Sequence, residues 1–208
     1  MLENMEWLGH DTFKIEYGGK VIYTDPFKLW DGLPKADLIL VTHEHRDHCS
    51  PEDIALIVKK DTVIVTPGNC EGKLTGDLRR VKPGDRLTEK GVDIEVVRAY
   101  NTNKKFHPRD NNWVGYIFTV DGTRIYIAGD TDHIPEMKEY RCDIALIPVS
   151  GTYVMTPEEA VQAANDIKPK VAVPMHYASI VGTEDDAKTF KKLYKGESHI
   201  FKQKSHEN

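Results

Sequence analysis

The stretch His43-Glu44-His45-Arg46-Asp47-His48 decides how this chain folds and what it can bind. Three histidines and one aspartate fall within six residues, directly after the apolar run of residues 36–41. A strand that ends in such a cluster crowds imidazoles and a carboxylate into a small volume, which is costly unless a cation neutralises and orients them. Mixed nitrogen and oxygen ligands suit zinc first, with iron, manganese or cobalt as alternatives. The stretch therefore predicts a metal site at the end of a buried strand.

The composition is that of a globular chain. Its 208 residues are 39% hydrophobic and 29% charged, and the net charge of −5 gives no general attraction to nucleic acid or to an anionic membrane. There is no signal-peptide pattern and no apolar run near the ~20 residues needed to span a bilayer. Three widely spaced cysteines indicate reduced thiols. We expect one cytoplasmic domain over residues 1–208 that acts on a small molecule, without nucleic-acid or membrane partners.

The order of the expected elements predicts the fold class. Antiparallel hairpins come first in each half of the chain, and alternating strands and helices follow. This mixture predicts two sheets packed face to face with helices outside. Expected strands cover residues 5–8, 13–17, 21–24, 38–42, 62–66, 86–99 (a hairpin), 115–120, 124–128, 144–149 and 171–174, and expected helices run from Ser50 to about 60, from Thr156 to about 167 and from Thr183 to about 194.

Four ligands on one loop rarely complete a site, so further ligands should follow later strands. Asp130 comes after an apolar strand in Gly129-Asp130-Thr131-Asp132, and His176 closes the strand at 171–174. Each has an ordinary alternative: Asp130 could be a turn residue, and His176 could be a structural histidine.

These motifs resemble the metallo-β-lactamase superfamily in their order and spacing over nearly the whole chain. Trp7-Leu8-Gly9-His10, Thr24-Asp25-Pro26-Phe27 and Trp113-Val114-Gly115-Tyr116 are also similar to a branch of small metal-dependent hydrolases. That branch includes L-ascorbate-6-phosphate lactonase and the N-acylphosphatidylethanolamine phospholipase D enzymes. The resemblance implies an αββα four-layer sandwich of two mixed sheets with helices on the outer faces, and self-association is common among such relatives.

The resemblance also implies a centre of two divalent metal ions, zinc first and manganese or iron as alternatives. His43 and His45 would hold the first ion. Asp47, His48 and His176 would hold the second, and Asp130 would bridge the two.

This sequence departs from the family pattern at one place. Relatives usually supply a third histidine to the first ion, but the matching stretch reads Arg98-Ala99-Tyr100-Asn101-Thr102-Asn103. Either Asn101 coordinates through its amide oxygen, or His107 folds back into the gap as a ligand or as a residue that contacts substrate. We favour His107, because imidazole binds such metals better than an amide does.

The expected reaction is hydrolysis by a metal-bound hydroxide of an ester, lactone or phosphodiester-type bond. Asp47 would orient that hydroxide and pass a proton to the leaving group. Asp25 is a candidate partner for a ligand histidine, and His10 could line the pocket. His133, Asp132 and Tyr153 could lie at its mouth.

Lys104, Lys105 and Arg109 make a local positive stretch that would suit an anionic substrate, although a solvated loop is the ordinary alternative. Two other functions stay open. One is a metal-binding or ligand-sensing module with impaired catalysis, which the absent third histidine suggests. The other is a nuclease, which the acidic charge disfavours.

Overall fold

The computed structural model describes residues 2–206, so residues 1, 207 and 208 of the predicted domain lie outside its described part. Two six-stranded sheets form, each from one contiguous half of the chain. The first has the order β1 (Met5–Gly9), β2 (Thr12–Tyr17), β3 (Lys20–Thr24), β4 (Leu38–Leu40), β5 (Val63–Pro67) and β6 (Asp77–Val81). The second has the order β12 (Val171–Met175), β11 (Ile144–Pro148), β10 (Thr123–Ile127), β9 (Val114–Val120), β8 (Val92–Arg98) and β7 (Arg86–Glu89).

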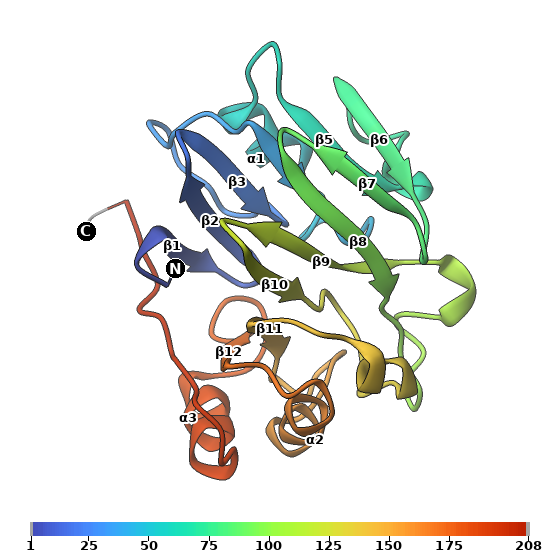
Figure 1. Cartoon of the computed structure of the whole chain (residues 1–208), viewed down its shortest axis with the longest axis vertical. Helices are drawn as coiled ribbons and strands as arrows, with labels where there is room; N and C mark the ends of the chain where they lie inside the picture. The colour runs from blue at the N-terminus through green and yellow to red at the C-terminus, as the bar shows by residue number, and fades with distance from the viewer. Residues whose placement is uncertain (1, 207–208) are drawn as a thin grey trace.

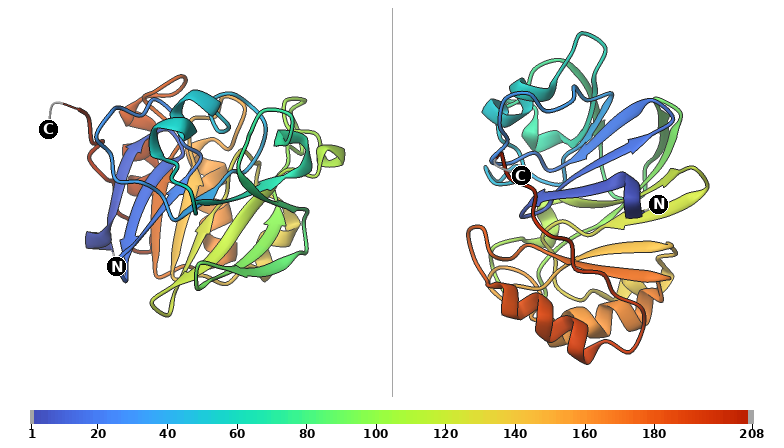
Figure 2. Two further views of the ribbon diagram at one scale, coloured as in Figure 1. Left: turned by 90° about the horizontal axis from the view of Figure 1, so that it is seen from above. Right: turned by 90° about the vertical axis from the view of Figure 1, so that its left-hand side faces the viewer.

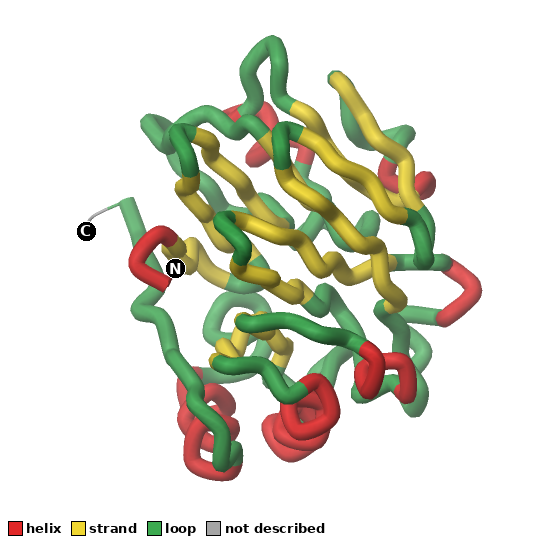
Figure 3. Tube along the Cα trace, in the orientation of Figure 1, coloured by secondary structure: helices red, strands yellow, loops and turns green. Residues whose placement is uncertain are grey.

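The sheets pack against each other and helices cover their outer faces (Figures 1 and 2). α1 (Pro51–Ile57) packs on the first sheet, while α2 (Pro157–Ile167) and α3 (Glu184–Leu193) lie together against β11 and β12 of the second. Short 3₁₀ turns lie at Leu2–Asn4, Gly68–Cys70, Arg109–Asn111 and Pro135–Glu139. Figure 3 shows in green the loops and turns that connect the strands and helices. The predicted αββα sandwich of two mixed sheets is confirmed.

Each sheet changes from antiparallel to parallel pairing along the chain. The β9–β10 hairpin turns at Asp121-Gly122 with φ values of 50° and 68°, the left-handed pair that a two-residue hairpin turn requires. β10 then pairs in parallel with β11, and β11 with β12, just as β3, β4 and β5 do in the first sheet. The carboxyl ends of the parallel strands therefore lie together at one edge.

The central strands are buried on both faces, which explains their uninterrupted apolar sequences. In β4, Leu38 and Leu40 point into the core between the sheets, whereas Ile39 points into the smaller core beneath α1. Tyr116 crosses from the second sheet and donates its hydroxyl hydrogen to the Val41 carbonyl at 2.7 Å. The two sheets are thus fixed to each other close to the histidine-rich loop.

The structure departs from the sequence-based prediction at β6 and at the end of α1. β6 is absent from the sequence-based prediction, because it is an edge strand whose charged side chains, such as Arg79 and Arg80, lack the apolar alternation of a covered strand. α1 ends at Ile57 rather than near residue 60, because Val58 has extended backbone (φ −71°, ψ 149°).

Candidate metal centre

The candidate ligands converge at the edge of the sandwich where the parallel strands end. His43 follows β4, Asp130 follows β10 and His176 follows β12. Groups of potential ligand atoms, each within 4.8 Å of the others in its group, contain all seven predicted residues. These are His43, His45, Asp47, His48, His107, Asp130 and His176.

The first group consists of His43, His45 and His107. His107 occupies the gap left by the expected third histidine, because the loop that carries it folds back. Asn101 closes this loop: its backbone N–H donates to the His107 carbonyl at 2.8 Å, and its Oδ1 accepts from the His107 N–H at 2.9 Å. Asn101 thus lies behind His107.

The second group consists of Asp47, His48 and His176, with His10 as a fourth member. His10 Nε2 lies 3.0 Å from Asp47 Oδ2. Asp47 is 26% exposed, whereas the side chains of His48 and His176 are at most 1% exposed. The site therefore opens to solvent on the side of Asp47.

Asp130 lies between the two groups. Its Oδ2 is 3.0 Å from His107 Nε2 and 3.9 Å from His43 Nε2. Its Oδ1 is 3.1 Å from His176 Nε2 and 3.3 Å from His48 Nε2. Each carboxylate oxygen therefore faces a different group, as the predicted bridging role requires.

Four candidate ligand histidines have their second ring nitrogen fixed by the protein, which lets us assign their tautomers. His48 Nδ1 donates to Asp25 Oδ2 at 2.8 Å, and His107 Nδ1 donates to Asn101 Oδ1 at 3.1 Å. The predicted role of Asp25 as a histidine partner is confirmed.

Hydroxyl groups hold the other two rings. The Thr42 hydroxyl donates to Asp25 at 2.7 Å, so it must accept from His43 Nδ1 at 3.0 Å. Ser150 donates to the Thr152 carbonyl and so accepts from His176 Nδ1 at 3.1 Å. The Nε2 atoms of all four rings therefore face the site, where His43 Nε2 also lies 3.1 Å from His45 Nδ1.

The atoms that face the centre of the site fit a bound cation. His48 Nε2, His107 Nε2, His176 Nε2 and Asp130 Oδ1 are buried without hydrogen-bond partners, although the nitrogens approach Asp130 to 3.0–3.3 Å. These atoms lie close together without hydrogen-bond geometry between them. Ligand atoms around a common ion have this arrangement.

The charge of the site also requires cations. Asp11, Asp25, Asp47 and Asp130 converge here, and within residues 2–206 no Lys or Arg forms an ion pair or hydrogen bond with any of them. Their charged partners among these residues are histidines, and a histidine is neutral when it binds a metal, so it would leave the carboxylates unbalanced. Divalent cations would balance these four negative charges.

The surrounding groups keep two carboxylates ionised. Burial opposes ionisation of Asp130, but the positive charge of His176 and His48 outweighs it and lowers the pKa of Asp130 well below its usual value. Burial also opposes ionisation of Asp47, yet hydrogen bonds with His10 and His48 lower its pKa. Both side chains are thus prepared to bind a cation.

The remaining predicted residues lie around the site in different roles. Asp132 is buried and organises the 101–107 loop by accepting from the Thr102 N–H at 2.7 Å and from Lys104 Nζ at 2.6 Å. His133 instead pairs with Asp166 of α2 at 2.8 Å, outside the ligand groups. Tyr153 is 37% exposed and packs edge-on against Phe106, next to His107.

One buried acid of the site is missing from the sequence-based prediction. Asp11 follows His10 in the turn between β1 and β2, and it groups with Asp130 and His176 and with Asp25 and His48. An aspartate in a turn is ordinary, so only the position next to His10 could have indicated it.

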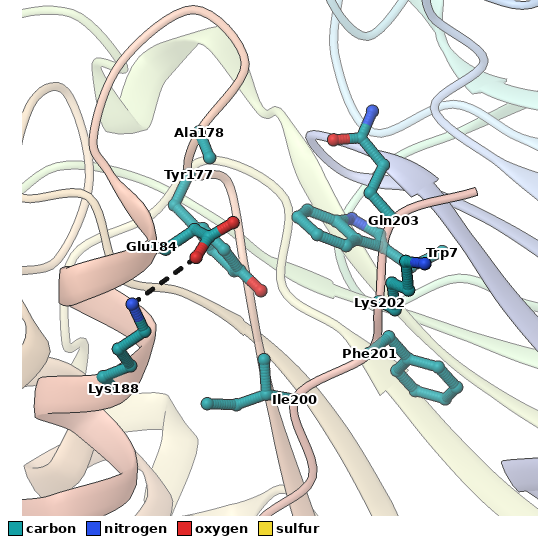
Figure 4. A pocket seen from close by; sticks show the side chains of 9 residues that line it. All are labelled: Trp7, Tyr177, Ala178, Glu184, Lys188, Ile200, Phe201, Lys202 and Gln203. Carbon is teal, nitrogen blue, oxygen red and sulfur yellow. Dashed lines mark ion pairs between the residues drawn. The ribbon is translucent and has the colours of Figure 1, made fainter. Parts of the chain in front are cut away.

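A separate pocket of about 320 Å³ is lined by residues of β1, α3 and the C-terminal segment, and by Tyr177, which follows His176. Figure 4 shows Trp7 and Tyr177 among the side chains that line it, together with the Glu184–Lys188 ion pair on α3. The Trp7 indole donates to the His10 carbonyl at 2.9 Å, and its ring lies 4.8 Å from that of Tyr177. This pocket contains none of the candidate ligands, and its aromatic wall supports the loops that carry His10 and His176.

The fold and this ligand arrangement agree with the comparison to known families. The model of the β-lactamase superfamily domain matches residues 4–176. The chain therefore belongs to the metallo-β-lactamase superfamily, as its motifs predict.

Its relatives within that superfamily are hydrolases that depend on metal. A UPF0173 metal-dependent hydrolase of Thermococcus kodakarensis is 34% identical over 91% of each chain. A crystal structure of a candidate metal-dependent hydrolase from Parabacteroides distasonis is 38% identical, with a TM-score of 0.85 over 96% of this chain and 93% of that one. A candidate zinc-dependent hydrolase from Thermotoga maritima is 26% identical, with a TM-score of 0.67 over 96% and 98%. The chain is thus a metal-dependent hydrolase of this superfamily.

None of the helices within residues 2–206 is long and apolar enough to cross a membrane.

Proposed function

We propose that the chain is a binuclear hydrolase that cleaves an ester, lactone or phosphodiester-type bond of a small molecule. One divalent ion would be held by His43, His45 and His107, and the other by Asp47, His48 and His176. Asp130 would bind both ions. The observation that carries this proposal is the orientation of the four histidines whose Nδ1 atoms are bound to Asn101, Asp25, Thr42 and Ser150. Zinc is the first expectation for a site this rich in imidazole, with manganese or iron as alternatives.

Divalent ions held there would supply an activated water near neutral pH and would polarise the substrate oxygen. The protein contributes a base at the open side of the site. Asp47 is partly exposed and is held in place by His10, so it can take a proton from the attacking water and pass one to the leaving group. His107 is only 1% exposed, which supports a role as a ligand rather than as a substrate contact.

The residues at the mouth favour an apolar group on the substrate over a strongly anionic one. Lys104 is bound to Asp132, and Arg109 pairs with Glu136 at 3.1 Å, so two of the three predicted anion-binding groups are already engaged. Phe106, which precedes His107 in the chain and is 53% exposed, packs on Tyr153 with ring centroids 4.6 Å apart. We place the apolar part of the substrate against these two rings.

The other expected properties stay proposals. A net charge of −5 supports a small-molecule substrate over nucleic acid or a membrane surface. Three free cysteines support a reducing, cytoplasmic location. Self-association, as relatives would suggest, stays a prediction. The position of His107 weakens the argument for a module with impaired catalysis, because that argument rested on a missing third histidine.

Metal analysis of protein purified without chelator tests the proposal. We expect about two equivalents of zinc, manganese or iron, and a large loss of metal in Asp130→Ala, since Asp130 faces both groups. Folded wild-type protein that binds no metal would contradict the proposal. Assays on lactones, carboxylesters and phosphodiesters then define the bond. Phe106→Ala should raise KM for substrates with an apolar substituent while kcat changes little.

A further inference from the structure

Asp11 is a buried acid that none of the roles above uses. It lies in the turn between β1 and β2 with 0% exposure. Both of its carboxylate oxygens are buried without a hydrogen-bond partner. Burying a carboxylate in this way is expensive, and proteins normally avoid it unless a cation or several donors face the group. Burial of Asp11 therefore destabilises the fold, and no hydrogen bond of its carboxylate offsets this.

The neighbours of Asp11 are His48 and His176 of the second group, together with Asp25 and Asp130. Asp11 Oδ2 lies 3.8 Å from His48 Nδ1, too far for a hydrogen bond and on a nitrogen already bound to Asp25. Its carboxylate also lies within 4.8 Å of ligand atoms of Asp130 and His176. The first group, made of His43, His45 and His107, does not include it.

We propose that Asp11 is the charge-balancing carboxylate of the second cation, the one assigned to Asp47, His48 and His176. The inference rests on the proposed binuclear site and adds to it an asymmetry between the two ions. The first ion would be surrounded mainly by imidazole and the second by several carboxylates. Since carboxylates matter most for oxygen-preferring cations, Asp11 should matter more when the second ion is manganese than when it is zinc.

A purely structural role for Asp11 predicts the opposite effect on stability. If Asp11 held the β1–β2 turn, its loss would destabilise the metal-free and metal-loaded protein alike. If Asp11 serves a cation, its replacement by the isosteric amide removes a carboxylate that lies close to the carboxylates of Asp25 and Asp130. The metal-free protein should then be at least as stable as the wild type, and only the stabilisation gained from metal should shrink.

The test compares wild type, Asp11→Asn, Asp11→Ser and the control Asp143→Asn. Asp143 is a paired carboxylate directly before β11, 2.8 Å from Lys170 Nζ, and belongs to none of the ligand groups. Each protein is stripped, titrated with Zn²⁺ or Mn²⁺, and measured by metal stoichiometry and by Tm with and without metal. Circular dichroism verifies that each variant is folded.

For Asp11→Asn we expect one equivalent to bind as in wild type and the other about 10–100-fold more weakly, with the larger loss for Mn²⁺ and no fall in the metal-free Tm. Asp11→Ser should show the same metal defect. Asp143→Asn should lower both Tm values and leave stoichiometry unchanged. Two equivalents bound with wild-type affinity by both Asp11 variants would overturn the role of Asp11 alone. A wild type that binds no metal would instead contradict the binuclear proposal itself.

Discussion

At the scale of single residues, the position of His107 is the feature that most changes the site expected from the motifs. We predict that His107→Ala binds one of the two ions much more weakly than the wild type does. The loss of affinity should exceed the roughly 10–100-fold that follows when a residue hydrogen-bonded to a metal ligand is removed. The physical reason is that His107 Nε2 faces Asp130 from the first group while Asn101 holds Nδ1. Metal competition with a chelator measures this affinity.

His133→Ala is the matched control, because that ring is bound to Asp166 and lies outside the ligand groups. It should keep the metal affinity of wild type. If His107→Ala also kept full metal content, His107 would not be a ligand, and Asn101 would be the next candidate for the first ion.

At the scale of elements, the turn after β10 places Asp130 and allows no side chain at Gly129. Gly129 has φ +62°, and a Cβ there would lie 2.9 Å from Thr42 Cβ. We predict that Gly129→Ala lowers the free energy of unfolding by about 2–5 kcal/mol through backbone strain and overpacking. Urea denaturation measures this change. The variant should also bind less metal, because Thr42 holds both Asp25 and His43.

Gly122→Ala separates the two contributions. Gly122 has a similar φ of +68° in the β9–β10 turn, but a Cβ there would have no neighbour within 4 Å. The free energy of unfolding of this variant should fall by only ~1–2 kcal/mol, because alanine is strained in the left-handed conformation. It should bind metal normally. Equal losses in both variants would mean that contact with Thr42 is unimportant.

The elements also show what the sequence can and cannot predict. Local chemistry predicted the capping boxes that start α2 at Thr156 and α3 at Thr183, and both are present. The strand ends predicted where Asp130 and His176 would lie. The sequence offered His107 and Asn101 as alternatives and favoured His107, but it could not show the contacts that hold the loop, such as Asp132 with Thr102, because they span some 30 residues. Asp11 was not predicted as part of the site, because the residues that it approaches there are distant from it in the chain.

At the scale of the whole molecule, metal removal should destabilise the fold. Once the ions are gone, histidines would be the basic partners of these four buried carboxylates among the described residues, and burying such charged pairs is costly. Free metal at about 1,000 times its Kd contributes ~4 kcal/mol, so a chelator should lower the Tm of a chain of this size by roughly 8–16 °C. Scanning calorimetry with and without chelator measures the shift. Asp130→Ala should show little of this shift, and an equally large shift there would place the stabilising ions elsewhere.

The division of the chain into two halves affects the kinetic stability of the folded protein. Each half builds its own sheet, and the candidate ligands come from both: His43 and Asp47 from the first, His107 and His176 from the second. With ions bound as proposed, the sheets cannot separate at this edge until coordination breaks. Unfolding would then wait for metal release, so resistance to proteolysis would follow the dissociation rate of the ions as well as the equilibrium stability.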